Sequence, residues 1–177
     1  MEQPLKIVIT GPESTGKSQL CQTLCAEHHI PYYGEYARSY LEKTGAQYGY
    51  KEFIEIYQGH LALQRKAVLA ASDLVLLDTD SINFKVWAQR VFKEVPDEIE
   101  EQIPNESDHL YLITYPDLPW QADPLRANPN DRLDIFNEHK ALIRSLNRPF
   151  KEIRGQGVTR LQNARSAISD YKRQASF

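Results

Sequence analysis

Two patterns of apolar and polar positions alternate along the chain. Short continuous apolar runs are typical of strands buried on both faces of a sheet, and longer runs with one apolar helical face are typical of amphipathic helices. The short runs predict strands at residues 4–10, 32–35, 74–78, 110–114 and 150–154. The longer runs predict helices at residues 17–28, 36–43, 51–71, 81–93, 133–146 and 158–171, with a short helix and a loop within 96–107.

Strands that alternate with helices predict an α/β fold. The expected architecture is a central five-stranded parallel sheet with helices on both faces, in three layers and in a single domain spanning residues 1–177. Ligands of such sheets bind beyond the carboxyl ends of the strands, so the residues that follow each strand are candidates for a site. Residues 115–132 carry several prolines and few periodic apolar positions, which predicts a long loop of the kind that acts as a lid.

The segment from Gly11 to Ser18 reads Gly-Pro-Glu-Ser-Thr-Gly-Lys-Ser and lies directly between the first predicted strand and the first predicted helix. This context predicts a phosphate loop, in which backbone N–H groups and a helix N-terminus surround a polyphosphate. Lys17 is expected to reach the β- and γ-phosphates, and the Ser18 hydroxyl to hold Mg²⁺. A chance glycine-rich turn is disfavoured because both flanks agree with the motif. The expected nucleotide-binding residues are Gly11, Glu13, Ser14, Thr15, Gly16, Lys17, Ser18 and Gln19.

Two aspartates follow the apolar run at residues 74–77. Asp78 closes the third predicted strand, which is where phosphate-loop enzymes place an aspartate that helps to hold Mg²⁺. Asp80 comes two residues later and could face an acceptor substrate. The alternative for either carboxylate is a purely structural role as the N-cap of the following helix, which Ser81 could also provide.

Glu35 ends the second predicted strand. A carboxylate at this edge could orient an acceptor hydroxyl in line with the γ-phosphate and take its proton. Arg38 lies three residues later on the same predicted helical face and could hold the acceptor or a phosphate. The alternative is an exposed Glu and Arg pair at helical spacing, which stabilises a helix only slightly.

The predicted lid carries Trp120, Asp123, Arg126 and Arg132 among its prolines. A guanidinium delivered by a closing segment would stabilise the charge on a phosphoryl group in transfer, and closure would exclude water. Arg126 and Arg132 are the candidates for this role. Trp120 could stack on an aromatic ligand or anchor the loop by packing beneath it.

Composition excludes several other classes of function. The formal net charge of −3 and the pI of about 6.0 disfavour nucleic acid and anionic membranes as partners and indicate a small-molecule substrate. The chain has no apolar run long enough to span a membrane and enters a strand by Leu5, so we expect a cytoplasmic location. Cys21 and Cys25 share an apolar helical stripe and are expected to be core thiols. The histidines show no metal-binding spacing, and no heptad run predicts an oligomer.

Four motifs in order resemble the ribosylnicotinamide kinase domain of NadR-type proteins, within the P-loop, AAA-like ATPases. They lie at residues 11–18, 35–40, 78–80 and 119–132, and the likeness covers nearly the whole chain. It implies a P-loop kinase that uses ATP and Mg²⁺ to phosphorylate the 5′-hydroxyl of nicotinamide riboside or a similar nucleoside, in NAD biosynthesis. The repressor and adenylyltransferase regions of full-length NadR are not carried over. The implied catalytic residues are Lys17, Glu35, Asp78, Arg126 and Arg132, and the implied acceptor-binding residues are Glu35, Tyr36, Arg38, Asp80, Trp120 and Asp123.

Two other functions use the same phosphate loop. One is a nucleotide-dependent switch, in which hydrolysis moves the 115–132 loop and a protein partner reads the result. The other is a kinase of nucleic acid 5′-ends, which the acidic net charge disfavours. A GTPase is also disfavoured, since no Asn-Lys-x-Asp guanine-reading motif is present.

Overall fold

The computed structural model describes residues 3–175 and contains a parallel four-stranded sheet in the order β2-β1-β3-β4. The strands are β1 (Leu5–Thr10), β2 (Leu74–Asp78), β3 (Leu110–Thr114) and β4 (Phe150–Ile153). Each coincides with a predicted strand to within a residue at either end. The α/β class is confirmed, and the sheet has one strand fewer than expected.

The missing strand is the one predicted at residues 32–35, which form no strand. Its two tyrosines are buried by a different route: Tyr32 packs with the apolar cluster on one face of the sheet and Tyr33 with the cluster on the other face. The Tyr32 hydroxyl also donates a hydrogen bond to Asp78 Oδ2 at 3.1 Å. The apolar pattern at residues 32–35 therefore reflects buried side chains and not a strand paired with the sheet. The prediction of five strands is wrong.

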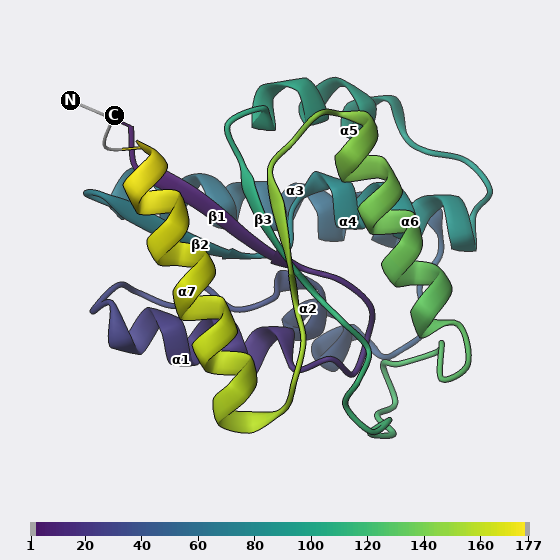
Figure 1. Cartoon of the computed structure of the whole chain (residues 1–177). Coiled ribbons are helices and arrows are strands. Elements are labelled where there is room, and N and C mark those ends of the chain that lie inside the picture. Colours follow the sequence, from purple (N-terminus) through teal and green to yellow (C-terminus); the bar gives the residue numbers. More distant parts are fainter. Residues whose placement is uncertain (1–2, 176–177) are drawn as a thin grey trace.

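Helices cover both faces of the sheet (Figure 1). On one face α1 (Lys17–Glu27) and α7 (Gly157–Ala175) lie side by side, and their apolar residues share a cluster with Ile7, Ile9 and Leu112. Cys21 and Cys25 belong to this cluster as buried free thiols. The opposite face is covered by α3 (Tyr50–Ala70), α4 (Ser81–Val91) and α6 (Arg132–Ser145). These faces form the predicted three layers.

A third apolar cluster lies away from the sheet. It joins α3 and α4 to α2 (Tyr36–Thr44), α5 (Asp97–Gln102) and the short 3₁₀ helix Ile103–Glu106. Phe53, Tyr57 and Phe84 are its large buried members. This cluster fixes α4 beside the carboxyl edge of the sheet. None of the helices within residues 3–175 is both long and apolar enough to cross a bilayer.

The parallel register brings three strand ends to one edge. Ile9 pairs with Asp78, and Thr10 pairs with Ile113, so the carboxyl ends of β1, β2 and β3 lie together. The Thr114 hydroxyl donates to the Thr10 carbonyl at 3.1 Å across this edge. Residues 115–131 then follow an irregular path before α6 begins. The long loop is therefore present, with its end at the start of α6.

Candidate active site

The residues between β1 and α1 have the backbone of a phosphate-binding loop. Gly11 has a φ of 128°, and a Cβ at this position would lie 2.8 Å from both Thr114 O and Thr114 Oγ1. Gly16 and Ser14 also have positive φ values, of 73° and 55°. The Thr15 hydroxyl bonds Pro12 O at 2.8 Å and Thr114 Oγ1 at 2.7 Å, which ties the loop to β3. Only glycine fits the close approach at Gly11, so the predicted motif has the conformation its spacing requires.

Lys17 lies at the centre of the charges of this loop. Its Nζ donates to Pro12 O at 2.7 Å, so the ammonium group folds over the loop itself. Burial lowers the pKa of Lys17, while the carboxylates of Glu35, Asp78 and Glu13 oppose this shift. Three carboxylates from different elements therefore surround one ammonium group. A polyphosphate would compete with them for the same cation.

The end of β2 fits a magnesium site. Asp78 is 4% exposed, and its Oδ2 accepts from Tyr32, while the Ser18 hydroxyl supplies a further interaction that favours the carboxylate. Asp78 Oδ1 is buried and has no hydrogen-bond partner within the described residues. Burial raises the pKa of Asp78 above its usual range. An unpartnered carboxylate oxygen beside a hydroxyl is the donor set that Mg²⁺ or its water shell would satisfy.

Glu35 lies near Lys17 and Asp78, although it comes from a different part of the sequence. It is the residue that precedes the first turn of α2, and it lines the cavity next to the phosphate loop. Burial and the nearby Asp78 charge raise the pKa of Glu35, while Lys17 and Arg38 act in the other direction. The described residues form no hydrogen bond to its carboxylate. Glu35 thus lines the cavity without a hydrogen-bond partner among the described residues.

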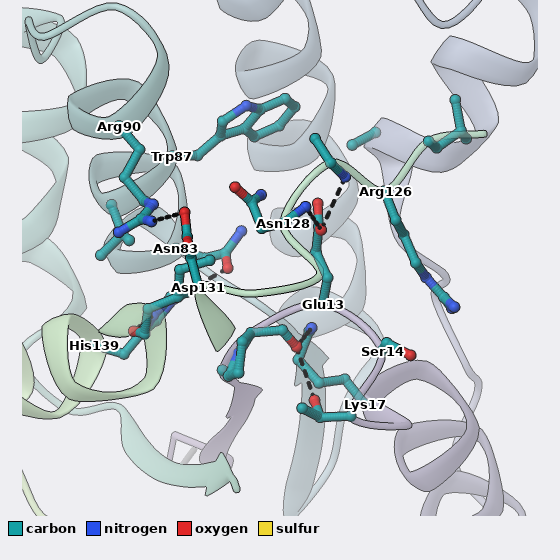
Figure 2. Close-up of a pocket in the computed structure, with 18 of the residues that line it drawn as sticks. Glu13, Ser14, Lys17, Asn83, Trp87, Arg90, Arg126, Asn128, Asp131 and His139 are labelled. Atoms are coloured by element: carbon teal, nitrogen blue, oxygen red, sulfur yellow. Dashed lines mark hydrogen bonds and ion pairs between the residues drawn. The ribbon is translucent and has the colours of Figure 1, made fainter. Parts of the chain in front are cut away.

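A cavity of about 1490 Å³ opens over the phosphate loop. Figure 2 shows Lys17 and Ser14 on one side of it and Asn83, Arg90, Asp131 and His139 on the other. Its volume exceeds the usual range for one small ligand and suits two substrates side by side. The predicted residues that line it are Gly11, Glu13, Ser14, Thr15, Gly16, Lys17, Ser18, Gln19, Glu35, Arg38 and Arg126.

The loop at residues 115–131 is bound directly to the phosphate loop. Glu13 Oε2 accepts from the backbone N–H groups of Ala127 and Asn128, at 3.1 and 3.0 Å. Ser14 Oγ accepts from the N–H of Gln121 at 2.8 Å. Figure 2 shows the Glu13 carboxylate beneath Asn128. Side chains of the nucleotide-binding motif therefore hold this loop over the cavity.

The two candidate arginines of the loop differ in their contacts. Arg132 begins α6, and its Nη1 donates to Ser14 O at 3.2 Å and to Leu118 O at 2.8 Å. Its guanidinium carbon lies 5.8 Å from the centroid of the Trp120 ring. Arg126 instead lines the cavity and donates to Gln121 O at 2.7 Å. Arg132 and Trp120 thus brace the loop, and Arg126 is the arginine that lines the cavity.

Asp80 does not face the cavity, which corrects its assignment to the acceptor. It is fully buried, and its Oδ1 accepts from the N–H of Ile82 at 3.0 Å, as the N-cap of α4. Its Oδ2 accepts from the Tyr111 hydroxyl at 2.6 Å and lies 3.0 Å from His109 Nδ1. These partners hold the pKa of Asp80 below its usual range against the effect of burial. Asp80 therefore has the structural role of an N-cap, which was the alternative for this residue.

Asp80 belongs to a buried polar cluster beneath α4. The ligand-capable atoms of Asp80, Glu106 and His109 lie within 4.8 Å of one another. Glu106 is 2% exposed and accepts from Ser81 Oγ at 2.8 Å, and burial raises its pKa to about 7. Arg148 donates to the Tyr111 hydroxyl at 2.8 Å, and Tyr111 in turn donates to Asp80. The cluster supports the start of α4, whose later turns line the cavity.

Two further acceptor-binding candidates also lie outside the cavity lining. Tyr36 packs directly against the backbone of Gly59 on α3. Asp123 accepts from Arg38 at 3.0 Å and from the N–H of Leu125 at 2.9 Å, so it connects the loop to α2. Both residues shape the surroundings of the cavity without facing it. Of the acceptor candidates, the structure brings Glu35 and Arg38 to the cavity.

Several residues of the cavity region gave no signal in the sequence. One wall is formed by Asn83 and Arg90 of α4 with His139 of α6, and Arg90 is paired with Asp131 and Glu138 at 3.0 and 2.6 Å. Behind the phosphate loop, Arg160 of α7 is 4% exposed and donates to Thr15 O at 2.9 Å and to Tyr115 O at 3.0 Å. Its position shortly after Gly155-Gln156-Gly157 is the only sequence cue for it. The other residues carry none, because their partners are remote in the chain.

A family model described as an AAA domain matches residues 6–160 of the chain. The chain belongs to this AAA domain family. Among solved structures, this AAA domain resembles the NadR protein in complex with NR, with a TM-score of 0.81 at 20% identity over 95% of this chain and 50% of that one. It also resembles NadR in complex with NAD and AMP-PNP, with a TM-score of 0.74 at 20% identity over 95% and 49%. A search of curated proteins found no match.

These likenesses establish a shared fold. The AAA domain described here spans about half the length of the two NadR chains it matches. Family membership makes it a phosphate-loop, nucleotide-binding domain, in agreement with the geometry at residues 11–18.

Proposed function

We propose that this AAA domain is an ATP-dependent kinase that phosphorylates the 5′-hydroxyl of a nucleoside, with nicotinamide riboside as the leading candidate. The observation that carries the proposal is a pair of carboxylates, Glu35 and Asp78, near Lys17, with Lys17 and Glu35 lining a cavity large enough for two substrates. A nucleotide-binding module that only hydrolyses ATP could use the second carboxylate to activate water, but it has no need of the extra volume. The NadR structure in complex with NR supports this acceptor through its fold.

The residues divide into a donor side and an acceptor side. The phosphate loop and Lys17 would bind the triphosphate, and Ser18 with Asp78 would hold Mg²⁺. The metal, when bound, would neutralise charge on the phosphates. Arg126 would lie over the transferring group, with Arg132 bracing the loop that carries it.

Glu35 would serve the acceptor. Its carboxylate would accept the proton of the 5′-hydroxyl while the hydroxyl oxygen bonds to the γ-phosphorus and the bond from that phosphorus to the β,γ-bridging oxygen breaks. ADP leaves with the electron pair of that bond. Catalysis would consist mainly of positioning and charge stabilisation, as in other phosphoryl transfers.

A nucleotide-dependent switch is the second candidate, because the 115–131 loop is bonded to Glu13 and Ser14 of the phosphate loop itself. A phosphate that displaced these side chains would move the loop, and a partner could read the movement. A nucleotide-dependent switch needs no acceptor molecule. The two candidates therefore differ in what ATP consumption depends on.

The deciding experiment is a panel of nucleosides incubated with Mg·ATP, with ADP release followed and products identified by mass. The kinase predicts strong stimulation by one nucleoside and a product heavier by one phosphoryl group. Slow ATP consumption that no nucleoside changes would reject the kinase and favour the switch.

A further inference from the structure

His139 lies between a backbone carbonyl and the side chain of Asn83. Its Nδ1 is 2.8 Å from Ile135 O, and its Nε2 is 3.2 Å from Asn83 Oδ1. The imidazole ring is 2% exposed, and the described residues offer it no other hydrogen-bond partner. The two contacts together determine which groups of this pair donate and which accept.

The carbonyl of Ile135 can only accept, so Nδ1 of His139 must carry a proton. Burial lowers the pKa of His139 to about 4, so the ring is neutral near pH 7 and has a single N–H. Nε2 is then an acceptor, and it needs a donor opposite it. Asn83 must therefore turn its amide NH₂ toward His139, with the amide nitrogen in the place of Oδ1.

This orientation turns the Asn83 carbonyl oxygen away from His139. Asn83 is half-buried and lines the cavity, and within residues 3–175 no side chain or backbone group bonds the second end of its amide. Figure 2 shows Asn83 beside His139 and Arg90 on the wall that lies across from Lys17. An unpaired acceptor thus faces the space next to the phosphate loop.

The neighbours of Asn83 limit what this acceptor can meet. The Arg90 guanidinium is already paired with Asp131 and Glu138, so it is not free to bind an anionic group. The indole of Trp87, one helical turn after Asn83, supplies an apolar surface to the same cavity. A phosphate oxygen would be repelled by the carbonyl oxygen, whereas a hydroxyl or an amide N–H would be bound by it.

We infer that Asn83, held by His139, is a specificity residue for the acceptor, and that its carbonyl oxygen receives a hydrogen bond from a hydroxyl or amide group of the bound nucleoside. The inference rests on the proposed function, because it assigns the acceptor of that reaction to this wall. His139 acts as a positioning residue that fixes the amide of Asn83. Donor groups of this kind are the ribose hydroxyls and a base carboxamide.

The first test concerns the pair alone and needs no substrate. A long-range ¹H–¹⁵N spectrum of the ¹⁵N-labelled protein distinguishes protonated from unprotonated imidazole nitrogens, and His139→Gln assigns the signals among the five histidines. The expected result is a neutral His139 with its proton on Nδ1. A proton on Nε2, on a neutral or a charged ring, would overturn the inference, since the Asn83 oxygen would then face the histidine.

The second test pairs a variant with substrate analogues. Asn83→Leu keeps the branching of the side chain without its polar atoms, and it should raise the KM of the accepted nucleoside by about 2- to 10-fold while kcat and the KM of ATP change little. Analogues that lack one donor, namely the 2′-deoxy and 3′-deoxy ribosides and a riboside with a carboxylate in place of the carboxamide, identify the group that is bound. For the correct analogue the wild type and Asn83→Leu should have the same KM.

Asn105→Leu is the matched control, because Asn105 is exposed on the 3₁₀ helix and lies outside the cavity lining. A KM penalty in Asn83→Leu that persists with every analogue would overturn the contact with substrate. If no nucleoside is phosphorylated, the proposed function fails, and nucleoside binding to wild type and Asn83→Leu, measured by calorimetry, still decides the role of Asn83. Equal affinity of both proteins for a bound nucleoside, or no binding at all, would reject it.

Discussion

The carboxylate of Glu13 accepts a hydrogen bond from the backbone N–H of Asn128 at 3.0 Å, across 115 positions of the chain. Glu13 belongs to the nucleotide-binding motif, and Asn128 to the loop that covers the cavity. Nucleotide binding and loop position are therefore coupled through one side chain. This coupling can be tested without knowledge of the substrate.

Replacing Glu13 with Ala should loosen the 115–131 loop. Two hydrogen bonds from backbone N–H groups to a carboxylate are lost, each worth about 1 kcal/mol net, so the amides of Ala127 and Asn128 should exchange at least about 5-fold faster. Hydrogen exchange of the ligand-free protein, read by mass spectrometry, measures the change. Glu94→Ala, at an exposed position after α4, is the control, and equal protection in both variants would disprove the tether.

Glu35→Gln tests the proposed general base. The amide keeps the shape of the side chain but cannot take up a proton, so kcat should fall by about tenfold or more while affinity for a non-hydrolysable ATP analogue stays the same. Steady-state kinetics and calorimetry provide the two measurements. Glu101→Gln, on the exposed face of α5, should behave as wild type. Near-normal turnover of Glu35→Gln would remove Glu35 from the mechanism.

Gly11→Ala should damage the phosphate loop itself. The new Cβ would meet Thr114 O and Thr114 Oγ1 at 2.8 Å, at a φ of 128° that other residues rarely adopt. We expect a loss of about 1–3 kcal/mol in the free energy of unfolding and weaker binding of ATP analogues. Denaturant titration and calorimetry check both. In Gly49→Ala the new Cβ meets only the flexible end of Glu52, so this control should keep both properties.

Glu106 should make stability depend on pH. Burial, assisted by the Asp80 charge, raises the pKa of Glu106 in the folded protein from its ordinary value of 4.5 to about 7. A raised pKa means that the folded state favours the protonated carboxyl. Its stabilising contribution is therefore complete below pH 4.5 and is lost as the pH rises through about 7. The loss is on the order of 1.4 kcal/mol for each unit of difference in pKa.

Glu106→Gln isolates this effect, because the amide does not titrate. The unfolding free energy of the wild type minus that of the variant should fall between about pH 5 and about pH 8. Urea titrations across this range measure it. The buried His60 and His139, each with a pKa of about 4, destabilise the fold as the pH falls and should do so equally in both proteins. A difference that does not vary with pH would show that Glu106 has an ordinary pKa.

Local sequence patterns predicted most of the fold. The strands at β1 to β4 and the helices that cover them follow from apolar periodicity, and the phosphate loop follows from a contiguous motif. The position of Asp78 at the carboxyl edge of the sheet could be predicted because it ends a strand, and a strand end has a defined place in a parallel sheet. These features depend on residues that are neighbours in the chain.

The errors and omissions have the opposite origin. Residues 32–35 look like a strand because their tyrosines are buried, but a strand also needs a backbone partner, which no local pattern specifies. Asp80 caps α4 locally, but its second carboxylate oxygen is occupied by His109 and Tyr111, about thirty residues away, and no local pattern specifies those contacts. Asn83 and His139 are 56 positions apart, and the sequence gives no sign of the contact between them. Contacts between remote residues decide these roles.

The contacts of Arg160 affect when, during synthesis, the phosphate loop can bind a nucleotide. Its guanidinium binds the carbonyl oxygen of Thr15, within the phosphate loop, from a helix that follows every strand of the sheet. A chain emerging from the ribosome would have its nucleotide motif made early but braced only after residue 160 has been released. Nucleotide binding should therefore appear late in synthesis, and the growing chain would spend that interval without the ligand that stabilises it.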